Sequence, residues 1–242
     1  MDKVKADKAG KKIDLKVPEH IGIIMDGNGR WATNRGFPRK MGYAKGAQVF
    51  RKIAEYCIKL KINTVTFYAF SSENWSRPQE EIDELMRLLN KYLDELLVTF
   101  TKYDAEIRFI GDISKLDGKL IEKIIELQDK TKGRTTNLNI AMNYGGRNEI
   151  INAVNNAIAK NKNKTDKITA EMLESELYTH GQKDPDLIIR TANELRLSNF
   201  LLWQSAYSEF WFTDVLWPDF TKKTLDEALL DYSSRKRRYG GV

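Results

Sequence analysis

The chain has 242 residues, 41% of them hydrophobic and 31% charged, and a formal net charge of +6, which is the composition of an ordinary globular domain with a sizeable core. No apolar run approaches the ~20 residues that span a bilayer, and the lysines near the N-terminus are not followed by the apolar segment of a secretory signal. Cys57 is the only cysteine, which excludes an internal disulfide, so we expect a cytoplasmic protein.

Apolar and β-branched runs alternate with helical patterns along the chain. Strands are predicted at residues 21–25, 63–70, 106–110, 137–142, 186–190 and 209–214. Helices are predicted near residues 44–60, 79–102, 114–132, 147–160, 170–178 and 224–235. This alternation predicts a single α/β domain over residues 18–242, with a mostly parallel six-stranded sheet and helices on both of its faces.

Polar residues and glycines cluster after most of the predicted strands, not before them. The clusters fall at residues 26–30, 71–77, 143–147 and 190–198. The carboxyl ends of parallel strands meet at one edge of a sheet, where the ligands of open α/β sheets bind. We therefore expect these clusters to form one binding site.

Arginines and one carboxylate predict an anionic ligand for this site. Arginine is always charged and can hold two phosphate oxygens at once, so several arginines indicate more than one phosphate group. The set comprises Asp26, Arg30, Arg39, Arg77, Arg190 and Arg196. Pairing with surface carboxylates is the alternative for any single arginine, but it explains the whole set less well. The predicted ligand is one diphosphate or two.

A carboxylate beside a diphosphate predicts Mg²⁺, which binds one or two carboxylates together with phosphate oxygens and water. Asp26 is the first candidate ligand and Glu209 is the second. Zinc and iron are not expected, because the two histidines and the single cysteine have no metal-ligand spacing. His20 is interpreted as a structural or helper residue.

Two other enzyme classes are disfavoured. Gly27, Gly29 and Ala32 formally match a dinucleotide fingerprint, but no acidic residue ends a strand about 20 residues further on, and no Walker A sequence is present. A serine hydrolase would need a base near Ser71 or Ser72, and no histidine lies near them in the sequence.

The segment over residues 71–77 is interpreted as a second substrate pocket. Its Asn74 is a very poor base, so a proton released near it goes to a neighbouring phosphate oxygen. The helix that follows carries a broad apolar stripe, which is ordinarily core, and the alternative is that part of it lines an apolar channel.

Several sequence blocks resemble the cis-prenyltransferase family, in particular its undecaprenyl diphosphate synthases. The blocks lie at residues 20–32, 68–78, 143–147 and 189–204, and residues 216–220 and 237–241 match as well. The resemblance therefore extends over nearly all of residues 18–241. The aspartate-rich signature of the trans-prenyltransferases is absent.

The resemblance implies a Mg²⁺-dependent condensation. An allylic diphosphate such as farnesyl diphosphate loses its diphosphate, isopentenyl diphosphate attacks, and loss of a proton leaves a cis double bond. Fixed cations stabilise the charge that builds on the leaving group. Small Ala69 leaves room in the product tunnel, which favours undecaprenyl diphosphate, the precursor of a cell-wall lipid carrier; Met142 could narrow the tunnel.

The resemblance also assigns roles. Asp26 and Asn74 are catalytic, and Asp26 and Glu209 hold the metal, Glu209 in its own site or in that of a partner subunit. The allylic diphosphate binds Gly27, Asn28, Gly29, Arg30 and Arg39, with Trp31 and Tyr43 also among the substrate-binding residues. Isopentenyl diphosphate binds Arg190, Arg196 and Ser198. The reacting ends are positioned by Ser71, Asn74, Trp75 and Arg77. Further substrate-binding residues are Ser72, Glu73 and Leu197. A homodimer is expected, with residues 205–214 and the carboxyl-terminal arginines near its interface.

Three positions depart from the family pattern. Tyr43 replaces the usual histidine, Ala192-Asn193 replaces a glycine-containing pair, and Leu195 stands where some members carry histidine. Because asparagine tolerates positive φ best among non-glycine residues, the second departure predicts weaker isopentenyl diphosphate binding or an altered condensation, not inactivity. Two alternatives to the undecaprenyl product follow. One is a paralogue that makes shorter or irregularly joined prenyl chains, and the other is a non-catalytic partner subunit.

Much of the positive charge lies near the chain ends, and residues 1–17 are interpreted as a flexible basic segment. The basic residues are Lys3, Lys5, Lys8, Lys11 and Lys12 at one end and Arg235, Lys236, Arg237 and Arg238 at the other. Solvated tails are the ordinary interpretation. The alternative is contact with a diphosphate or with the anionic inner face of a membrane, where each basic residue contributes roughly 1 kcal/mol. Nucleic acid is the least favoured partner, and none is expected.

Overall fold

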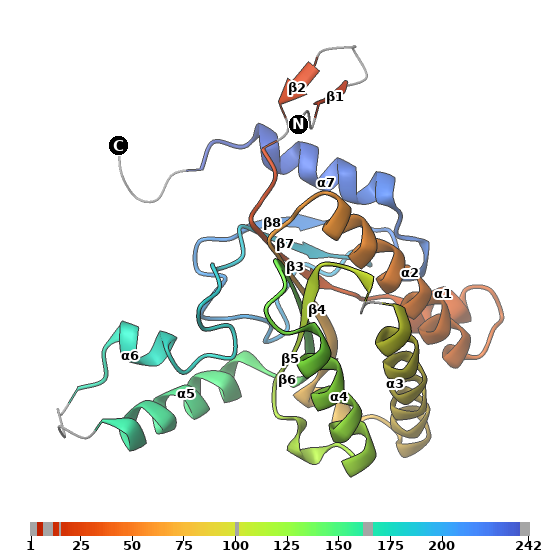
Figure 1. Cartoon of the computed structure of the whole chain (residues 1–242). Coiled ribbons are helices and arrows are strands. Elements are labelled where there is room, and N and C mark those ends of the chain that lie inside the picture. The colour runs from red at the N-terminus through yellow and green to blue at the C-terminus, as the bar shows by residue number, and fades with distance from the viewer. Residues whose placement is uncertain (1–3, 7–11, 15, 100–101, 162–166, 238–242) are drawn as a thin grey trace.

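A computed structural model describes residues 4–6, 12–14, 16–99, 102–161 and 167–237. Its centre is a parallel sheet of six strands in the order β5-β6-β4-β3-β7-β8 (Figure 1). The first strand of this sheet in the sequence, β3, lies in its middle, between β4 and β7. The predicted single-domain α/β fold with a six-stranded parallel sheet is confirmed.

Every predicted strand of this sheet is present, with ends that shift by a few residues. The strands are β3 (His20–Ile24), β4 (Thr64–Ser71), β5 (Ala105–Ile110), β6 (Thr136–Tyr144), β7 (Leu187–Arg190) and β8 (Glu209–Phe212). The inner strands were recognisable because strands buried on both faces read as continuous apolar runs. All residues of β3 and β7 are buried.

The helices also lie near the predicted positions, although α2 begins at Arg39 and not near residue 44, and α6 ends at Glu174 and not near residue 178. They are α2 (Arg39–Lys59), α3 (Gln79–Thr99), α4 (Gly118–Thr131), α5 (Gly146–Lys160), α6 (Ala170–Glu174) and α7 (Lys222–Ser234). The helix expected near 114–132 begins later because the side chain of Asp117 caps α4 by accepting from the Lys119 N–H at 3.0 Å. No helix in the described part of the chain is long and apolar enough to cross a membrane.

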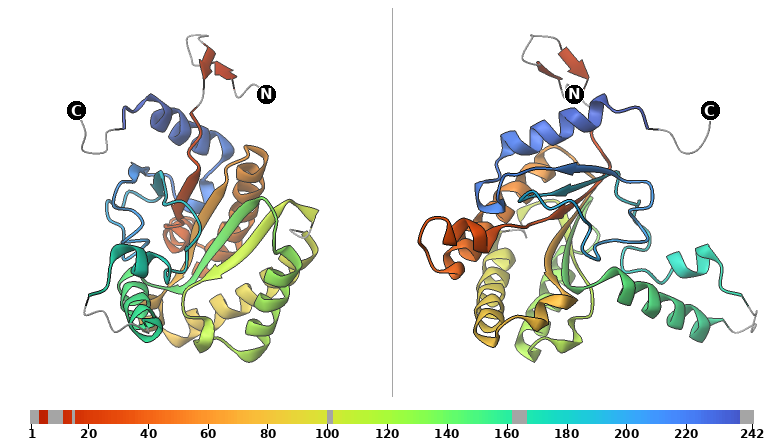
Figure 2. Two further views of the ribbon diagram at one scale, coloured as in Figure 1. Left: turned by 60° about the vertical axis from the view of Figure 1, so that its left-hand side comes forward. Right: turned by 180° about the vertical axis from the view of Figure 1, so that it is seen from behind.

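The two faces of the sheet are covered differently. One face packs on α2, α3, α4 and α7, and Val49, Leu93, Ile124 and Leu229 from these helices join Phe67 of β4 in the main core. On the other face, Phe200 and Leu201 of an irregular segment cover the strands, while α5 and α6 extend away from the body (Figure 2). The prediction of helices on both faces is therefore accurate mainly for the first face.

A short helix not predicted from the sequence, α1 (Asn28–Thr33), follows β3 directly. Gly27 caps it with φ of 98°, a left-handed conformation that glycine adopts without a steric penalty. α1 packs on α2 so closely that a Cβ at Gly42 or Gly46 would overlap the carbonyl and side-chain oxygens of Asn28. The packing of α1 on two glycines of α2 therefore fixes the loop after β3.

The N-terminal segment contains two short antiparallel strands, β1 (Val4–Ala6) and β2 (Lys12–Asp14), where a flexible segment was expected. They form a sheet separate from the central one. Lys3, Lys8, Lys11 and Arg238 of the predicted basic ends, and residues 239–241 of the family resemblance, lie outside the described residues.

His20 lies buried at the start of β3. Its Nδ1 is 2.6 Å from the carbonyl oxygen of Lys183, which can only accept, so Nδ1 carries the hydrogen. Its Nε2 then accepts from the Thr66 hydroxyl at 2.7 Å. Burial lowers the pKa of His20 from 6.5 to about 4, against the opposing effects of the Lys183 carbonyl and Asp186. The expected structural role fits these contacts.

This pKa predicts a pH-dependent stability. Between pH 6.5, the ordinary pKa of histidine, and about pH 4, the pKa of folded His20, the unfolded chain binds a proton at His20 and the folded chain does not. Stability is therefore lost as the pH falls through this window. As the pH falls from about 7.5 to about 5, this difference should lower the free energy of unfolding by about 2 kcal/mol. Urea unfolding at both pH values should show a smaller loss for His20→Gln, whereas exposed His180→Gln should behave like the wild type. Equal losses in all three proteins would contradict this prediction.

Candidate active site

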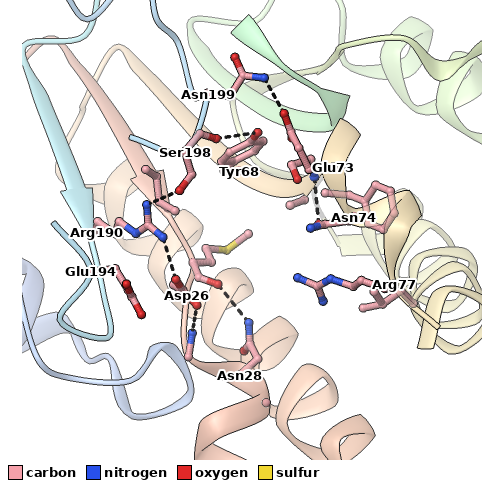
Figure 3. Close-up of a pocket in the computed structure, with 18 of the residues that line it drawn as sticks. Asp26, Asn28, Tyr68, Glu73, Asn74, Arg77, Arg190, Glu194, Ser198 and Asn199 are labelled. Carbon is pink, nitrogen blue, oxygen red and sulfur yellow. Dashed lines mark hydrogen bonds and ion pairs between the residues drawn. The ribbon is translucent and has the colours of Figure 1, made fainter. Parts of the chain in front are cut away.

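A cavity of about 870 Å³ lies beyond the carboxyl ends of β3, β4, β6 and β7 (Figure 3). The structure brings most of the predicted site residues together on its wall. They are Asp26, Gly27, Asn28, Gly29, Arg30, Arg39, Tyr43, Ser71, Glu73, Asn74, Arg77, Arg190, Arg196 and Ser198. Residues up to 172 positions apart in the sequence, from Asp26 to Ser198, therefore lie in one site at the carboxyl ends of the strands.

Asp26 and Arg190 form the central pair of this cavity. The guanidinium of Arg190, with a side chain only 4% exposed, donates to Asp26 at 2.9 Å and to the hydroxyl of Ser198 at 2.8 Å. It also donates to the carbonyl of Arg196. A buried charge of this kind is tolerated only when it is paired, so Asp26 and the loop after β7 depend on each other.

Glu194 is a second carboxylate that pairs with two arginines of the cavity. It lies 3.0 Å from Arg30, and it also pairs with Arg196. These side chains are partly exposed, and exposed ion pairs contribute little to stability. A phosphate group can therefore replace Glu194 as the partner of either arginine at small cost.

The segment after β4 forms the opposite wall. Residues Ser72–Ser76 make a 3-10 turn in which the Asn74 side chain accepts from the Ser71 N–H at 3.1 Å. Glu73 accepts from Asn199 at 2.7 Å, so this turn is tied to the loop after β7 (Figure 3). Burial opposes ionisation of Glu73, but the hydrogen bonds from Asn199 and nearby groups hold its pKa below the usual value. Glu73 is therefore a fixed negative group on this wall.

An apolar cavity of about 160 Å³ adjoins the polar one. The junction between them is formed by the residues that line both cavities, which are Met25, Asn28, Tyr43, Tyr68, Ala69, Phe70 and Leu85. The apolar cavity runs between α2, α3 and the sheet, and its other lining residues include Phe50, Leu89, Ile140 and Met142. Part of the apolar stripe of α3 thus lines a channel, which was the alternative interpretation from the sequence.

Asp26 has the chemistry of a magnesium ligand. Its two oxygens accept from the Gly27 N–H at 2.6 Å and from Arg190, which leaves lone pairs free on a side chain that is 32% exposed to the cavity. The described residues contain no group of three or more His, Cys, Asp or Glu side chains that could hold a metal alone. Phosphate oxygens and water are therefore needed for the remaining ligands, as Mg²⁺ prefers.

Five predicted site residues do not line the cavity. Trp31 donates to Asp219 at 2.7 Å, and Trp75 donates to Asn143 at 2.7 Å. Leu197 is partly buried and packs against the buried cluster that contains Phe200. Ser72 donates to Glu73 at 3.2 Å. Glu209 starts β8 level with Leu187, at the opposite end of the sheet from Asp26, and accepts from Arg235 at 2.8 Å. Glu209 does not meet Asp26 within one chain.

The sequence interpretation missed four charged or amide residues of this region. Arg147, Glu194 and Asn199 line the polar cavity, and Glu81 lies behind Arg39, Tyr43 and Arg77. Arg147 and Glu194 fall within the polar clusters that follow strands, which was the available signal. Glu81 lies inside a helix, where no such signal exists.

The departure at Ala192-Asn193 occupies a left-handed backbone. Ala192 has φ of 72° and Asn193 has φ of 56°. Asparagine is one of the residues that tolerate this conformation, whereas alanine carries a steric penalty there. The loop after β7 thus has the left-handed backbone conformation that glycine favours, although neither of these two residues is glycine.

Comparisons with known proteins agree with this geometry. A protein-family model described as putative undecaprenyl diphosphate synthase matches residues 24–240. An isoprenyl transferase of Clostridium tetani is 46% identical over 236 residues, which cover 96% of this chain and 92% of that protein. An isoprenyl transferase of Bacillus thuringiensis subsp. konkukian is 46% identical over 230 residues, which cover 93% of this chain and 89% of that protein.

Two crystal structures share the fold. Lavandulyl diphosphate synthase from Lavandula x intermedia, in complex with dimethylallyl diphosphate, has a TM-score of 0.87 and 34% sequence identity. A probable undecaprenyl diphosphate synthase from Campylobacter jejuni has a TM-score of 0.78 and 35% identity. Each comparison covers 93% of this chain and 99% of the other one.

Proposed function

Because the chain belongs to the undecaprenyl diphosphate synthase family of isoprenyl transferases and is therefore a prenyltransferase, we propose that it condenses isopentenyl diphosphate onto an allylic diphosphate to make a long cis-prenyl diphosphate. One observation carries the proposal. An arginine-lined cavity continues directly into an apolar one, which suits a ligand with a charged head and a prenyl tail. Farnesyl diphosphate is the proposed primer, and undecaprenyl diphosphate is the proposed product.

The chain's own residues supply charge stabilisation in this reaction. When the allylic C1–O bond breaks, negative charge builds on the leaving diphosphate, and fixed guanidinium groups stabilise that charge without reorganising. Arg30 and Arg39 are proposed for this diphosphate, and Arg190, Arg196 and Ser198 for that of isopentenyl diphosphate. The proton lost in forming the cis double bond passes to a phosphate oxygen, since the amide of Asn74 is too weak a base to keep it.

Magnesium is the proposed cofactor. Bound at Asp26 with phosphate oxygens, it would neutralise charge on the departing diphosphate. Because Glu209 lies at the far end of the sheet, its proposed role as a metal ligand requires a second copy of the chain. We therefore propose a homodimer in which Glu209 is a magnesium ligand in the active site of the partner subunit.

The function is tested by incubating the protein with farnesyl diphosphate, labelled isopentenyl diphosphate and Mg²⁺, and then measuring product chain length. A ladder ending at a long cis-prenyl diphosphate supports the proposal, and EDTA should abolish it. Absence of any extended product would instead support the non-catalytic alternative.

The lavandulyl diphosphate synthase similarity favours one second candidate. That protein holds dimethylallyl diphosphate, and its fold matches this chain with a TM-score of 0.87. A paralogue that joins prenyl units irregularly would consume dimethylallyl diphosphate supplied alone. A wild-type protein that reacts with that single substrate, and fails to extend farnesyl diphosphate, would establish the second candidate.

Ala69 at the junction of the two cavities predicts control of product length. Its side chain is exposed in the strand and lines both cavities. Ala69→Leu should narrow the entrance to the apolar cavity, so products should become shorter while the first condensation stays fast. Chain-length analysis of wild type and variant under equal conditions checks this. An unchanged product ladder would show that the prenyl chain does not pass Ala69.

A further inference from the structure

Four polar side chains meet where the starts of α2 and α3 lie side by side. They are Arg39 and Tyr43 of α2, Arg77 just before α3, and Glu81 of α3. Glu81 accepts from the Tyr43 hydroxyl and from Arg77 at 2.7 Å, and it forms an ion pair with Arg39 at 3.3 Å. Arg39, Tyr43 and Arg77 line the polar cavity, and Glu81 lies behind them. We call these four residues the arginine clamp.

The Tyr43 hydroxyl is the centre of the arginine clamp. Besides donating to Glu81, it accepts from Arg77 at 3.0 Å and from Arg39 at 3.3 Å. Burial and the hydrogen bond to Glu81 raise the pKa of Tyr43, so the hydroxyl keeps its proton at neutral pH. Burial opposes ionisation of Glu81, but Tyr43 and the two arginines hold its pKa below the usual value. The clamp thus contains one carboxylate, one neutral phenol and two cations.

Both guanidinium groups keep donors that the clamp does not use. Nη1 of Arg39 and the Nε and Nη2 of Arg77 have no hydrogen-bond partner in the part of the chain that the structure describes. Figure 3 shows Arg77 reaching into the cavity opposite Asp26. Arg77 is held through Nη1 alone, so its Nε and Nη2 present a fork that matches phosphate geometry. Arg39 is held through Nε and Nη2 and offers Nη1 as a single donor group.

We propose that Tyr43 and Glu81 are positioning residues, which hold Arg39 and Arg77 in the orientation that binds the diphosphate of the allylic substrate. The inference rests on the proposed function and deepens it, since it adds the residues that organise one substrate group. A free arginine loses rotamer entropy when it binds a phosphate, and a clamped one has lost it already.

The simple alternative is that Glu81 only ties α2 to α3. Removing the charge of Glu81 distinguishes the two possibilities, because they predict opposite changes in diphosphate affinity. Glu81→Gln removes a negative charge near an anion site, so by Coulomb attraction alone it should tighten diphosphate binding. Positioning predicts the opposite sign, because the amide holds two cations less firmly than the carboxylate does.

The test uses Tyr43→Phe and Glu81→Gln in the full-length protein, with Tyr56→Phe as the matched control. Tyr56 also lies on α2 and also donates to a carboxylate, Asp226, at 2.8 Å, but it lines none of the cavities described above. Binding of inorganic pyrophosphate is measured by calorimetry, together with the KM for each substrate, kcat and the melting temperature.

Each clamp variant should raise the pyrophosphate Kd and the KM for farnesyl diphosphate about tenfold, the loss expected for a hydrogen bond to a charged group. The KM for isopentenyl diphosphate should change little. The kcat should also fall, because Arg39 is proposed to stabilise charge on the leaving diphosphate. Tyr56→Phe should resemble the wild type in binding. Tighter pyrophosphate binding by Glu81→Gln, or unchanged affinity in Tyr43→Phe, would overturn the inference while wild-type activity upholds the proposed function. A wild-type protein that extends no primer would overturn both.

Discussion

Asp26→Ala is expected to lower kcat by about 10³-fold and to leave a folded protein. Asp26 is the carboxylate that accepts from both Arg190 and the Gly27 N–H at the end of β3, and it offers the free lone pairs proposed for magnesium. Its removal leaves the charge of Arg190 without its carboxylate partner and removes one of the two protein ligands proposed for magnesium. Turnover should therefore fall far more than substrate affinity.

The measurement is incorporation of labelled isopentenyl diphosphate at saturating Mg²⁺, with circular dichroism to verify folding. Asp94→Ala is the matched control, because Asp94 also forms an ion pair, with Lys123 at 2.6 Å, but lines neither cavity. A variant that retains half of the wild-type activity would refute the central role given to Asp26.

Arg190→Lys is expected to reduce kcat/KM for isopentenyl diphosphate by about 10²–10³-fold, although the charge is kept. Arg190 bridges Asp26, Ser198 and the carbonyl of Arg196, which lie in different directions around its planar group. A lysine ammonium is a single point charge on a flexible stem and cannot reproduce these contacts together with a phosphate contact. The loop after β7 would then lose its anchor.

Steady-state kinetics with varied isopentenyl diphosphate checks this second result. Arg87→Lys serves as control, since the Arg87 side chain is 64% exposed and pairs only with Glu84 among the described contacts. Equal kinetics in Arg190→Lys and the wild type would mean that the positive charge alone matters, not the guanidinium geometry.

The sheet was predictable because each of its strands is specified by a short run of neighbouring residues in the sequence. β3 contains the apolar run 21–24 and β7 the apolar run 187–189, and polar residues follow each run. Parallel topology then places those residues at one edge, so Asp26, Ser71 and Arg190 could be grouped without knowing any contact. The position of Arg190 at the end of β7 is a direct result of this rule.

Other features were not predictable because they depend on tertiary contacts. α1 is too short to show a periodicity, and it forms because Gly42 and Gly46 let it pack on α2. Glu81 follows Glu80 in the first turn of α3, where acidic residues are ordinary, and only the fold brings Tyr43 and two arginines to it. Glu209 matched the chemistry of a metal ligand, but its position in β8 is at the wrong end of the sheet for its own Asp26.

The joined polar and apolar cavities have a consequence for turnover. Under the proposed function, each added isoprene unit lengthens the part of the product that leaves water inside the protein. At about 0.8 kcal/mol per buried CH₂, one unit slows escape by more than one order of magnitude. The finished product would then bind tightly and inhibit the enzyme that made it. The steady-state rate should therefore rise when detergent micelles or lipid vesicles that accept the prenyl tail are added.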